Sequence, residues 1–224
     1  MPDYFSHAIC AQKILENCNK KTRSLICDGT LFNMGAQGGD VFFTYKLKLG
    51  DSNLGRRLHT LSASELFNKL LEGNLSYACG FATHYALDST LHPVVYAFEN
   101  SCRTPFAHMR FEADLGLFIS RKYGVTRRIL PYERVLSSTF KIYDSIVKIE
   151  PQITLTGVER CLKRHVALSR EMLKRKRTSF ILDYDFSSLS GIVEDAVSLG
   201  IACVEGVADG CIDEELFSNS FNAK

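Results

Sequence analysis

Side chains of the types that ligate metals are concentrated in two neighbouring runs, HYALDSTLHP and HMRFEADLGLF. His84 and Asp88 are four residues apart, as are His108 and Glu112, and His92 follows Asp88 at the same spacing. Residues four apart lie one above the other on a helix, so each pair can direct an imidazole and a carboxylate at one ion. Imidazole and carboxylate without thiolate suit zinc. The two runs therefore predict a metal site carried by helices.

Both pairs lie on faces that the apolar periodicity predicts to be buried. Tyr77, Phe81 and Tyr85 share a stripe with the first pair, and Leu115 and Ile119 share a face with the second. A buried carboxylate must be paired, hydrogen-bonded or metal-bound, because desolvating it alone costs several kcal/mol. The alternative is that the pairs are His–carboxylate contacts on solvated helix faces. Their place on apolar stripes favours a metal site.

The composition is that of an ordinary globular protein. Its 224 residues fit one domain, residues 1–224, with 46% hydrophobic residues and a net charge of +2, which implies no obligate nucleic-acid partner. No stretch approaches the roughly 18 apolar residues of a membrane-spanning helix, and MPDYFSHAICAQKIL lacks the features of an export signal. The eight cysteines include no C-x-x-C pair. We therefore expect free thiols and a cytoplasmic protein.

Helical periodicity dominates the chain and predicts an all-α fold. We expect helices over residues 5–17, 39–47, 62–72, 75–91, 105–123, 132–148, 156–176 and 188–200, with a further one near 211–220. Pro93 disfavours helical geometry at His92, so the helix that carries His84 and Asp88 should end just before His92. The imidazole of His92 would then turn away from that pair, towards a second ion.

Charge is segregated near the end of the sequence. Residues 160–177 carry eight Lys and Arg against one Glu, whereas residues 178–223 carry nine Asp and Glu and no Lys or Arg. The basic run is either a solvated helix facing an acidic C-terminal hairpin, or a surface attracted to anionic lipid or nucleic acid. Near an anionic bilayer each basic group contributes about 1 kcal/mol. His165 lies in this run, away from the metal motifs, and we interpret it as structural.

Three further residues are candidate ligands. His7 lies at the start of the first predicted helix, Asp40 ends the glycine-rich run LFNMGAQGGD, and His59 lies in GRRLHT. Taken alone, Asp40 would be an ordinary helix N-cap and His59 an ordinary loop histidine. Their significance depends on whether the fold brings them to the two His–carboxylate pairs.

Five runs together resemble the bacterial zinc-dependent phospholipase C family: MPDYFSH, GAQGGDVFF, GRRLHT, HYALDSTLHP and HMRFE. The superfamily also contains the secreted single-strand-specific zinc nucleases. The resemblance covers roughly residues 1–120, and residues 121–224 add only compatible helices. It implies a single multi-helix domain with a cluster of two or three zinc ions between core helices.

The resemblance also implies which side chains bind each ion. The ligands of one zinc would be two imidazoles and two carboxylates: Asp40, His59, His84 and Asp88. The ligands of another would be His92, His108 and Glu112. Asp88 would bridge to a third ion, whose other ligands would be His7 and the N-terminal amine.

Two features depart from the family pattern. Secreted members expose the amine that binds the third zinc by signal cleavage, whereas this sequence begins Met1-Pro2. A retained Met1 would displace the amine and weaken the third site, where Asp3 could substitute. The H-x3-D-x3-H spacing is also tighter than in the secreted enzymes. We therefore expect the two-metal core to be more secure than the third site.

The implied activity is hydrolysis of a phosphodiester by metal-activated water. Asp40 and Asp88 are the candidate catalytic residues, with Asp40 placed to orient or deprotonate the nucleophile. We expect a phospholipase C-like enzyme acting on a phospholipid or small-molecule phosphodiester, with Phe42, Phe43 and Tyr45 as an apolar rim and with peripheral contact to an anionic membrane surface. The alternatives are a zinc nuclease or nucleotide phosphodiesterase, and a non-catalytic haemerythrin-like di-iron protein, which uses similar H-x3-E pairs.

Overall fold

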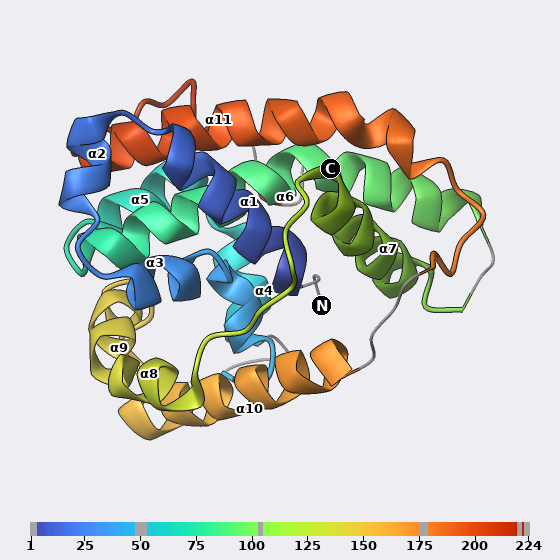
Figure 1. Cartoon of the computed structure of the whole chain (residues 1–224). Helices are drawn as coiled ribbons and strands as arrows, with labels where there is room; N and C mark the ends of the chain where they lie inside the picture. The colour runs from blue at the N-terminus through green and yellow to red at the C-terminus, as the bar shows by residue number, and fades with distance from the viewer. Residues whose placement is uncertain (1–3, 48–52, 103–104, 175–178, 219–220, 222–224) are drawn as a thin grey trace.

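The computed structural model describes residues 4–47, 53–102, 105–174, 179–218 and 221. These residues form one all-helical domain of eleven α-helices and two short 3-10 helices (Figure 1). In chain order the elements are α1 (Tyr4–Asn17), α2 (Lys20–Leu25), α3 (Gly29–Gly35), η1 (Gly38–Phe42), α4 (Leu54–Thr60), α5 (Ala63–Leu70), α6 (Leu75–Ser101), α7 (Ala107–Lys122), α8 (Tyr132–Ser137), α9 (Thr139–Val147), α10 (Leu155–Lys174), η2 (Phe186–Leu189) and α11 (Ser190–Ala208). The predicted all-α fold is confirmed. No helix in the described ranges combines the length and apolar character needed to cross a bilayer.

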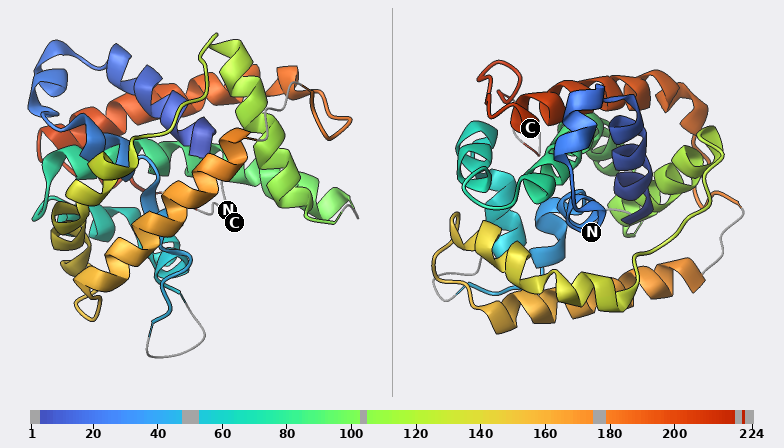
Figure 2. Two further views of the ribbon diagram at one scale, coloured as in Figure 1. Left: turned by 60° about the horizontal axis from the view of Figure 1, so that its bottom comes forward. Right: turned by 60° about the vertical axis from the view of Figure 1, so that its left-hand side comes forward.

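Helix α6 is the central element, because every residue from Ser76 to Ser89 is buried. A helix that is buried on all sides must be surrounded by other elements. Helix α11 lies along α6, with α3 and α1 against its other sides (Figures 1 and 2). Gly200 lets α11 approach α1 as well, since a Cβ there would lie 2.3 Å from a methyl carbon of Ile14 in α1. Helix α10 runs along the opposite edge of the molecule and packs against α8, α9 and η1.

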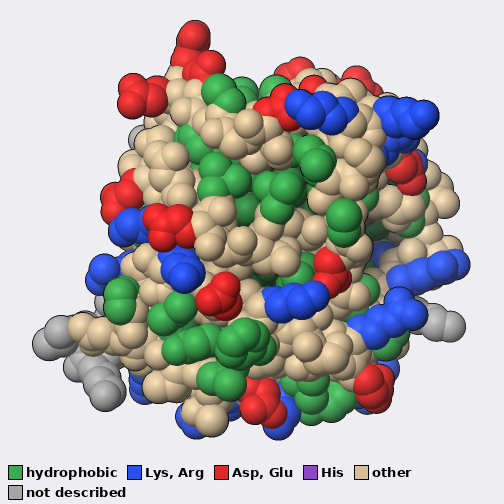
Figure 3. Space-filling model, turned by 90° about the vertical axis from the view of Figure 1, so that its left-hand side faces the viewer, with side chains coloured by type: hydrophobic (Ala, Val, Ile, Leu, Met, Phe, Trp, Pro, Cys, Tyr) green, Lys and Arg blue, Asp and Glu red, His purple; other side chains and the backbone are tan. Residues whose placement is uncertain are grey.

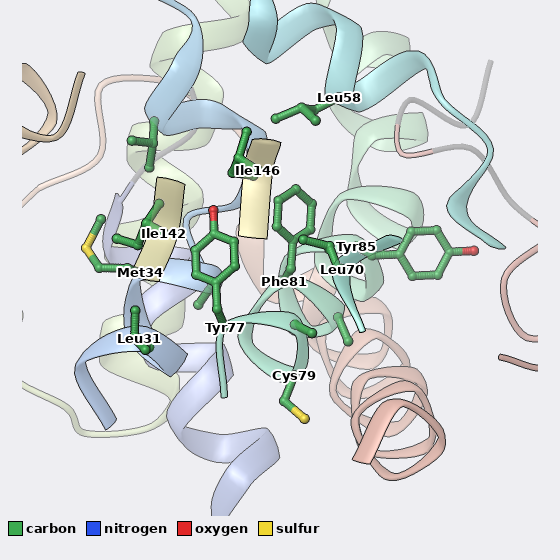
Figure 4. Close-up of a cluster of buried hydrophobic side chains, with 14 of the residues drawn as sticks. Leu31, Met34, Leu58, Leu70, Tyr77, Cys79, Phe81, Tyr85, Ile142 and Ile146 are labelled. Carbon is green, nitrogen blue, oxygen red and sulfur yellow. The ribbon is translucent and has the colours of Figure 1, made fainter. Parts of the chain in front are cut away.

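The apolar side chains of the described residues form two clusters, and α6 passes from one into the other. Tyr77 and Phe81 of α6 belong to the first cluster, among side chains of α3, α5 and α9 (Figure 4). Leu87, Leu91 and Val95 of α6 belong to the second cluster, which α1, α7, η2 and α11 complete. The polar residues of α6 from His84 to His92 therefore lie where the two apolar clusters meet.

The predicted end of this helix before His92 is wrong, because α6 continues through Pro93 to Ser101. Proline in a helix interior costs about 3 kcal/mol through its missing N–H and its clash with the preceding turn. Pro93 itself is exposed, whereas Leu91 and Val95 on either side are buried. Full burial of one such side chain contributes about 1.5–3 kcal/mol, so packing on both sides of Pro93 offsets its cost.

Several shorter elements also differ from the prediction. The helix predicted at 39–47 is only the 3-10 helix η1, after which Lys46 forms an isolated antiparallel bridge with Asn53. The helix predicted at 132–148 is broken into α8 and α9 at Ser138, whose hydroxyl donates to the Arg134 carbonyl. Helix α11 extends eight residues beyond the predicted end at 200 to Ala208, and Gly210 follows it with a φ of 70°.

The helix predicted near 211–220 is wrong as well, since the described residues 211–218 form turns rather than a helix. Three helices were not predicted at all: α2, α3 and α4. Each begins at a side chain that caps it, because Asn19, Asp28 and Asn53 accept hydrogen bonds from backbone N–H groups of the first turn. Tertiary packing stabilises such short helices, which have little periodicity of their own.

The close approach of α3 and α6 yields a stability prediction. A Cβ at Gly80 would lie 2.0 Å from the backbone oxygen of Phe32, so Gly80→Ala should force the helices apart and lower the free energy of unfolding by about 1–3 kcal/mol. Gly191→Ala is the matched control: it lies in α11 with open space around it and should gain up to about 1 kcal/mol from helix propensity. Urea denaturation measures both. A neutral Gly80→Ala would contradict the packing described.

Candidate metal centre

The candidate ligands come from five elements and meet at the junction of the two apolar clusters. Helix α6 supplies the central residues, and the others come from η1, α4, α7 and α1. Among the described residues three groups could each hold an ion, namely His59–His84–Asp88, His7–Asp40–His84 and His92–His108–Glu112. The structure thus brings together all eight residues that the sequence analysis proposed as ligands.

Asp40 joins the first of these groups, and the four residues form a compact set. His84 Nε2 lies 3.3 Å from Asp88 Oδ2 and 3.2 Å from His59 Nε2. His59 Nε2 lies 3.4 Å from both Asp88 Oδ2 and Asp40 Oδ1. Ligand atoms at zinc distance from one tetrahedral ion are about 3.3 Å apart. The spacing of the three atoms of His59, His84 and Asp88 therefore fits a single tetrahedral cation, and Asp40 Oδ1 adjoins this group at His59.

Hydrogen bonding shows that lone pairs converge on this point. His59 Nδ1 is 2.7 Å from the Gly55 carbonyl, which can only accept, so Nδ1 carries the hydrogen and the lone pair of the neutral ring is on Nε2. Asp40 Oδ1 and Asp88 Oδ2 are buried and have no hydrogen-bond partner among the described residues. Buried polar atoms without a partner require an explanation. A cation among them satisfies all of these groups at once.

Two glycines let the backbone of η1 reach the imidazoles. Gly38 has a φ of 50°, and a Cβ there would lie 2.1 Å from a ring carbon of His84. A Cβ at Gly39 would lie 2.6 Å from a ring carbon of His59. Only glycine combines the left-handed conformation with such contact. The GGD run therefore serves to carry Asp40 between the two histidines.

The second group lies one helical turn further along α6. His108 Nε2 is 2.9 Å from Glu112 Oε1, and His92 Nε2 is 3.7 Å from the same oxygen. His108 Nδ1 donates to Glu99 at 3.1 Å, which again leaves Nε2 directed at the group. Glu112 Oε2 is buried without a hydrogen-bond partner among the described residues. His92 thus reaches the second group, as expected, but from within the continuous helix.

Asp88 connects the groups through its two oxygens. Oδ2 faces His59 and His84, while Oδ1 lies 3.4 Å from His7 Nε2 and 3.8 Å from His92 Nε2. This arrangement suits a carboxylate that bridges ions. The N-terminal amine and Asp3, which were considered for the third ion, lie outside the described residues, so His7 is the part of that site that the structure places.

The buried carboxylates change the protonation of the imidazoles around them. Burial lowers the pKa of His59, but the two neighbouring carboxylates outweigh burial and raise it to about 10. The pKa of His92 is raised to about 9 in the same way, against burial, by Asp88 and Glu112. Burial, the largest cause, lowers the pKa of His84 to about 4. Without a metal, protons on His59 and His92 therefore balance the carboxylates, and metal binding must displace them.

The space within the centre is small, and one side of it is open. A cavity of about 20 Å³ is lined by His7, Asp88, His92 and Glu112 together with apolar side chains, which is room for about one water molecule. Of the eight residues, His108 is the most exposed, with 23% of its side chain accessible. No histidine is visible on the face that α2 and α5 help to form (Figure 3). The most exposed ligand of the centre is therefore on α7.

The sequence analysis missed the groups that orient the ligands. The Gly55 carbonyl, Glu99 and the backbone of Phe221 hold the Nδ1 atoms of His59, His108 and His92. Glu99 lies nine residues before His108, and no local spacing rule connects them. His165 packs its ring 5.5 Å from that of Tyr4, and burial lowers its pKa to about 4. It is in none of the three ligand groups.

Comparison with known proteins identifies a family. A family model described as zinc-dependent phospholipase C matches residues 6–166, a segment that includes all eight candidate ligands. Neither the curated proteins nor the solved structures give a match.

The bridging geometry predicts unequal effects of two substitutions. Asp88→Asn should lose more zinc than His59→Ala, because both Asp88 oxygens face ligand nitrogens and an amide supplies no charge. Zinc at 100 times its Kd stabilises the folded protein by about 2.7 kcal/mol. Chelator should therefore lower the melting temperature of the wild type, and this decrease should be smallest in Asp88→Asn.

Asp114→Asn controls for the loss of any buried carboxylate. Asp114 is fully buried on α7 but accepts from the N–H groups of Ile181 and Leu182, so this variant should melt earlier and keep its zinc. Elemental analysis and thermal melts measure both effects. Equal, small zinc losses in Asp88→Asn and His59→Ala would contradict the bridge.

Proposed function

Since the chain belongs to the zinc-dependent phospholipase C family, we propose that it is a phosphodiester hydrolase of the phospholipase C type with two or three zinc ions. The observation that carries the proposal is that buried ligand atoms of His84, Asp88 and Asp40 converge on His59 Nε2, each at 3.2–3.4 Å from it. This donor set of imidazole and carboxylate fits zinc.

Bound zinc would supply a Lewis acid that brings the pKa of a water towards 7 and offsets the charge of the phosphoryl group. The chain itself positions the carboxylates and the side chains that surround the ions. Asp40 and Asp88 hold negative charge at the centre of the site, where a proton from water could be accepted, and we propose them as the catalytic carboxylates. Phe43 stacks on His59 with ring centroids 5.3 Å apart, and it shields that ligand from solvent.

We further propose that the substrate is a phospholipid. The expected rim of Phe42, Phe43 and Tyr45 does not supply the apolar surface, since Phe42 is fully buried and Phe43 covers His59. Two other side chains do: Phe106 is 74% exposed and Met109 is 48% exposed, on either side of His108 at the open edge of the centre.

The backbone at Phe106 supports this assignment. Phe106 has a φ of 58°, and among the described residues it is the one non-glycine residue with a positive φ. Such a conformation costs about 1–3 kcal/mol and persists mainly where function requires it. Here it begins α7 with the phenyl ring directed outward, although burial would be the ordinary fate of a phenylalanine. A lipid surface is the partner that suits this exposed ring.

The basic run contributes less to membrane contact than its composition implies. Lys163 and Lys174 form ion pairs with Glu159 and Glu171, and the Arg170 guanidinium lies over the Tyr132 ring. Residues 175–177 lie outside the described ranges. The pairing favours a solvated helix face, so we propose that membrane contact is made mainly by apolar insertion at Phe106 and Met109.

A substrate panel tests the proposed activity. The zinc-loaded protein should release phosphocholine from phosphatidylcholine vesicles and should also cleave bis-p-nitrophenyl phosphate, with both activities lost on chelation and restored by zinc. Cleavage of single-stranded DNA but not of lipid would support the nuclease alternative. No chelator-sensitive hydrolysis of any of the three would leave a metal-binding protein and refute the enzymatic proposal.

The apolar edge predicts a difference between lipid and soluble substrates. The double substitution Phe106→Ser and Met109→Ser should lower kcat/KM on vesicles about 100-fold or more, because burying two such side chains contributes about 1.5–3 kcal/mol each and about 1.4 kcal/mol corresponds to tenfold. It should leave hydrolysis of bis-p-nitrophenyl phosphate unchanged. Phe140→Ser is the control, since Phe140 is 65% exposed on α9. Loss of vesicle activity only at high salt would assign membrane contact to the basic run instead.

A further inference from the structure

The chain beyond α11 returns to the metal centre, although it lies outside the family match. Asp213 accepts from the N–H groups of Glu215 and Leu216, which turns the segment back towards α6. The Tyr85 hydroxyl then donates to the Leu216 carbonyl at 3.3 Å. Phe217 is buried against Phe67, with ring centroids 4.7 Å apart. These contacts bring the chain back to the side of α6 on which Phe221 lies.

Phe221 reaches the ligands themselves. Its side chain is fully buried, and its ring lies 5.7 Å from that of His59 and 6.0 Å from that of His84. The same ring contacts Phe81 and Tyr85, which belong to the first apolar cluster. Phe221 therefore forms an apolar wall against these two imidazoles.

The backbone of Phe221 makes the more specific contact. His92 Nδ1 lies 3.0 Å from the Phe221 carbonyl oxygen, which can only accept, so Nδ1 is the donor. The lone pair of the neutral ring is then on Nε2, which faces Glu112 and Asp88 at 3.7 and 3.8 Å. His59 and His108 use acceptors close to them in sequence, whereas His92 depends on a carbonyl 129 residues away.

We infer that Phe221 is a positioning residue for the metal centre: its carbonyl selects the His92 tautomer that presents Nε2 to the second ion, and its ring excludes water from His59 and His84. The inference rests on the metal binding in the proposed function, not on the substrate. Groups that orient a ligand in this way change metal affinity by about 10- to 100-fold. Phe221 is thus part of the site, although it supplies no ligand atom.

Cobalt(II) binding to the full chain tests the inference, with Co²⁺ as the probe and no substrate present. Phe221→Ala keeps the carbonyl but removes the ring that anchors it against Phe81 and Tyr85, so it should bind the Co²⁺ ion of the His92 group about 10- to 100-fold more weakly and should change the visible absorption of the bound ion. Phe217→Ala is the matched control: it removes an equally buried ring from the same segment that touches Phe67 and Tyr85 but no histidine. It should be less stable and yet keep the wild-type cobalt spectrum and affinity.

The outcomes separate this inference from the proposed function. Wild-type protein that binds less than one equivalent of Co²⁺ would overturn both. Normal binding by wild type together with unchanged binding by Phe221→Ala would overturn the inference alone, as would equal losses in Phe221→Ala and Phe217→Ala. If either alanine variant fails to fold, Phe221→Leu and Phe217→Leu are compared in the same way, and only Phe221→Leu should alter the spectrum.

Discussion

The burial of three carboxylates in an apolar interior is the constraint on which the rest of the structure depends. The side chains of Asp40, Asp88 and Glu112 are at most 7% exposed. Charge placed there without compensation would cost several kcal/mol for each group. The imidazoles around the carboxylates can compensate for it only by holding protons or by sharing cations with them. Either way, the fold must bring residues from five separate elements to one place.

The packing of the helices follows from that requirement. Helix α6 is buried on all sides along fourteen residues, from Ser76 to Ser89, and its polar groups lie between two apolar clusters. Glycine at positions 38 and 39 lets η1 approach the imidazoles, and glycine at 35 and 80 lets α3 approach α6. Small residues in the core are thus placed where polar groups or backbones must come close, and large aromatic rings fill the remaining space.

How much of this could be predicted depended on whether the relevant spacing was local. The pairs His84–Asp88 and His108–Glu112 were predictable, because one helical turn determines their geometry. Asp40 and His59 could be proposed only through the family resemblance, since nothing in GRRLHT itself indicates a buried helical histidine. Pro93 misled the prediction because a local preference of about 3 kcal/mol was outweighed by the burial of Leu91 and Val95. The contact between His92 and Phe221 joins residues 129 apart, and no pattern in the sequence connects them.

The position of both ligand groups on α6 has a consequence for which ions the centre can accept. Asp88 and His92 are one turn apart, so about 6 Å of rigid helix separates their backbones. A helix held by its own hydrogen bonds does not stretch to suit a larger ion. An ion of different radius must therefore be accommodated by movement of the short elements, η1 and α4 for the first group and the start of α7 for the second. Discrimination between metals by size would consequently reside in the glycine-rich turn before Asp40 and at the left-handed Phe106, rather than in the helix that carries three of the eight ligands.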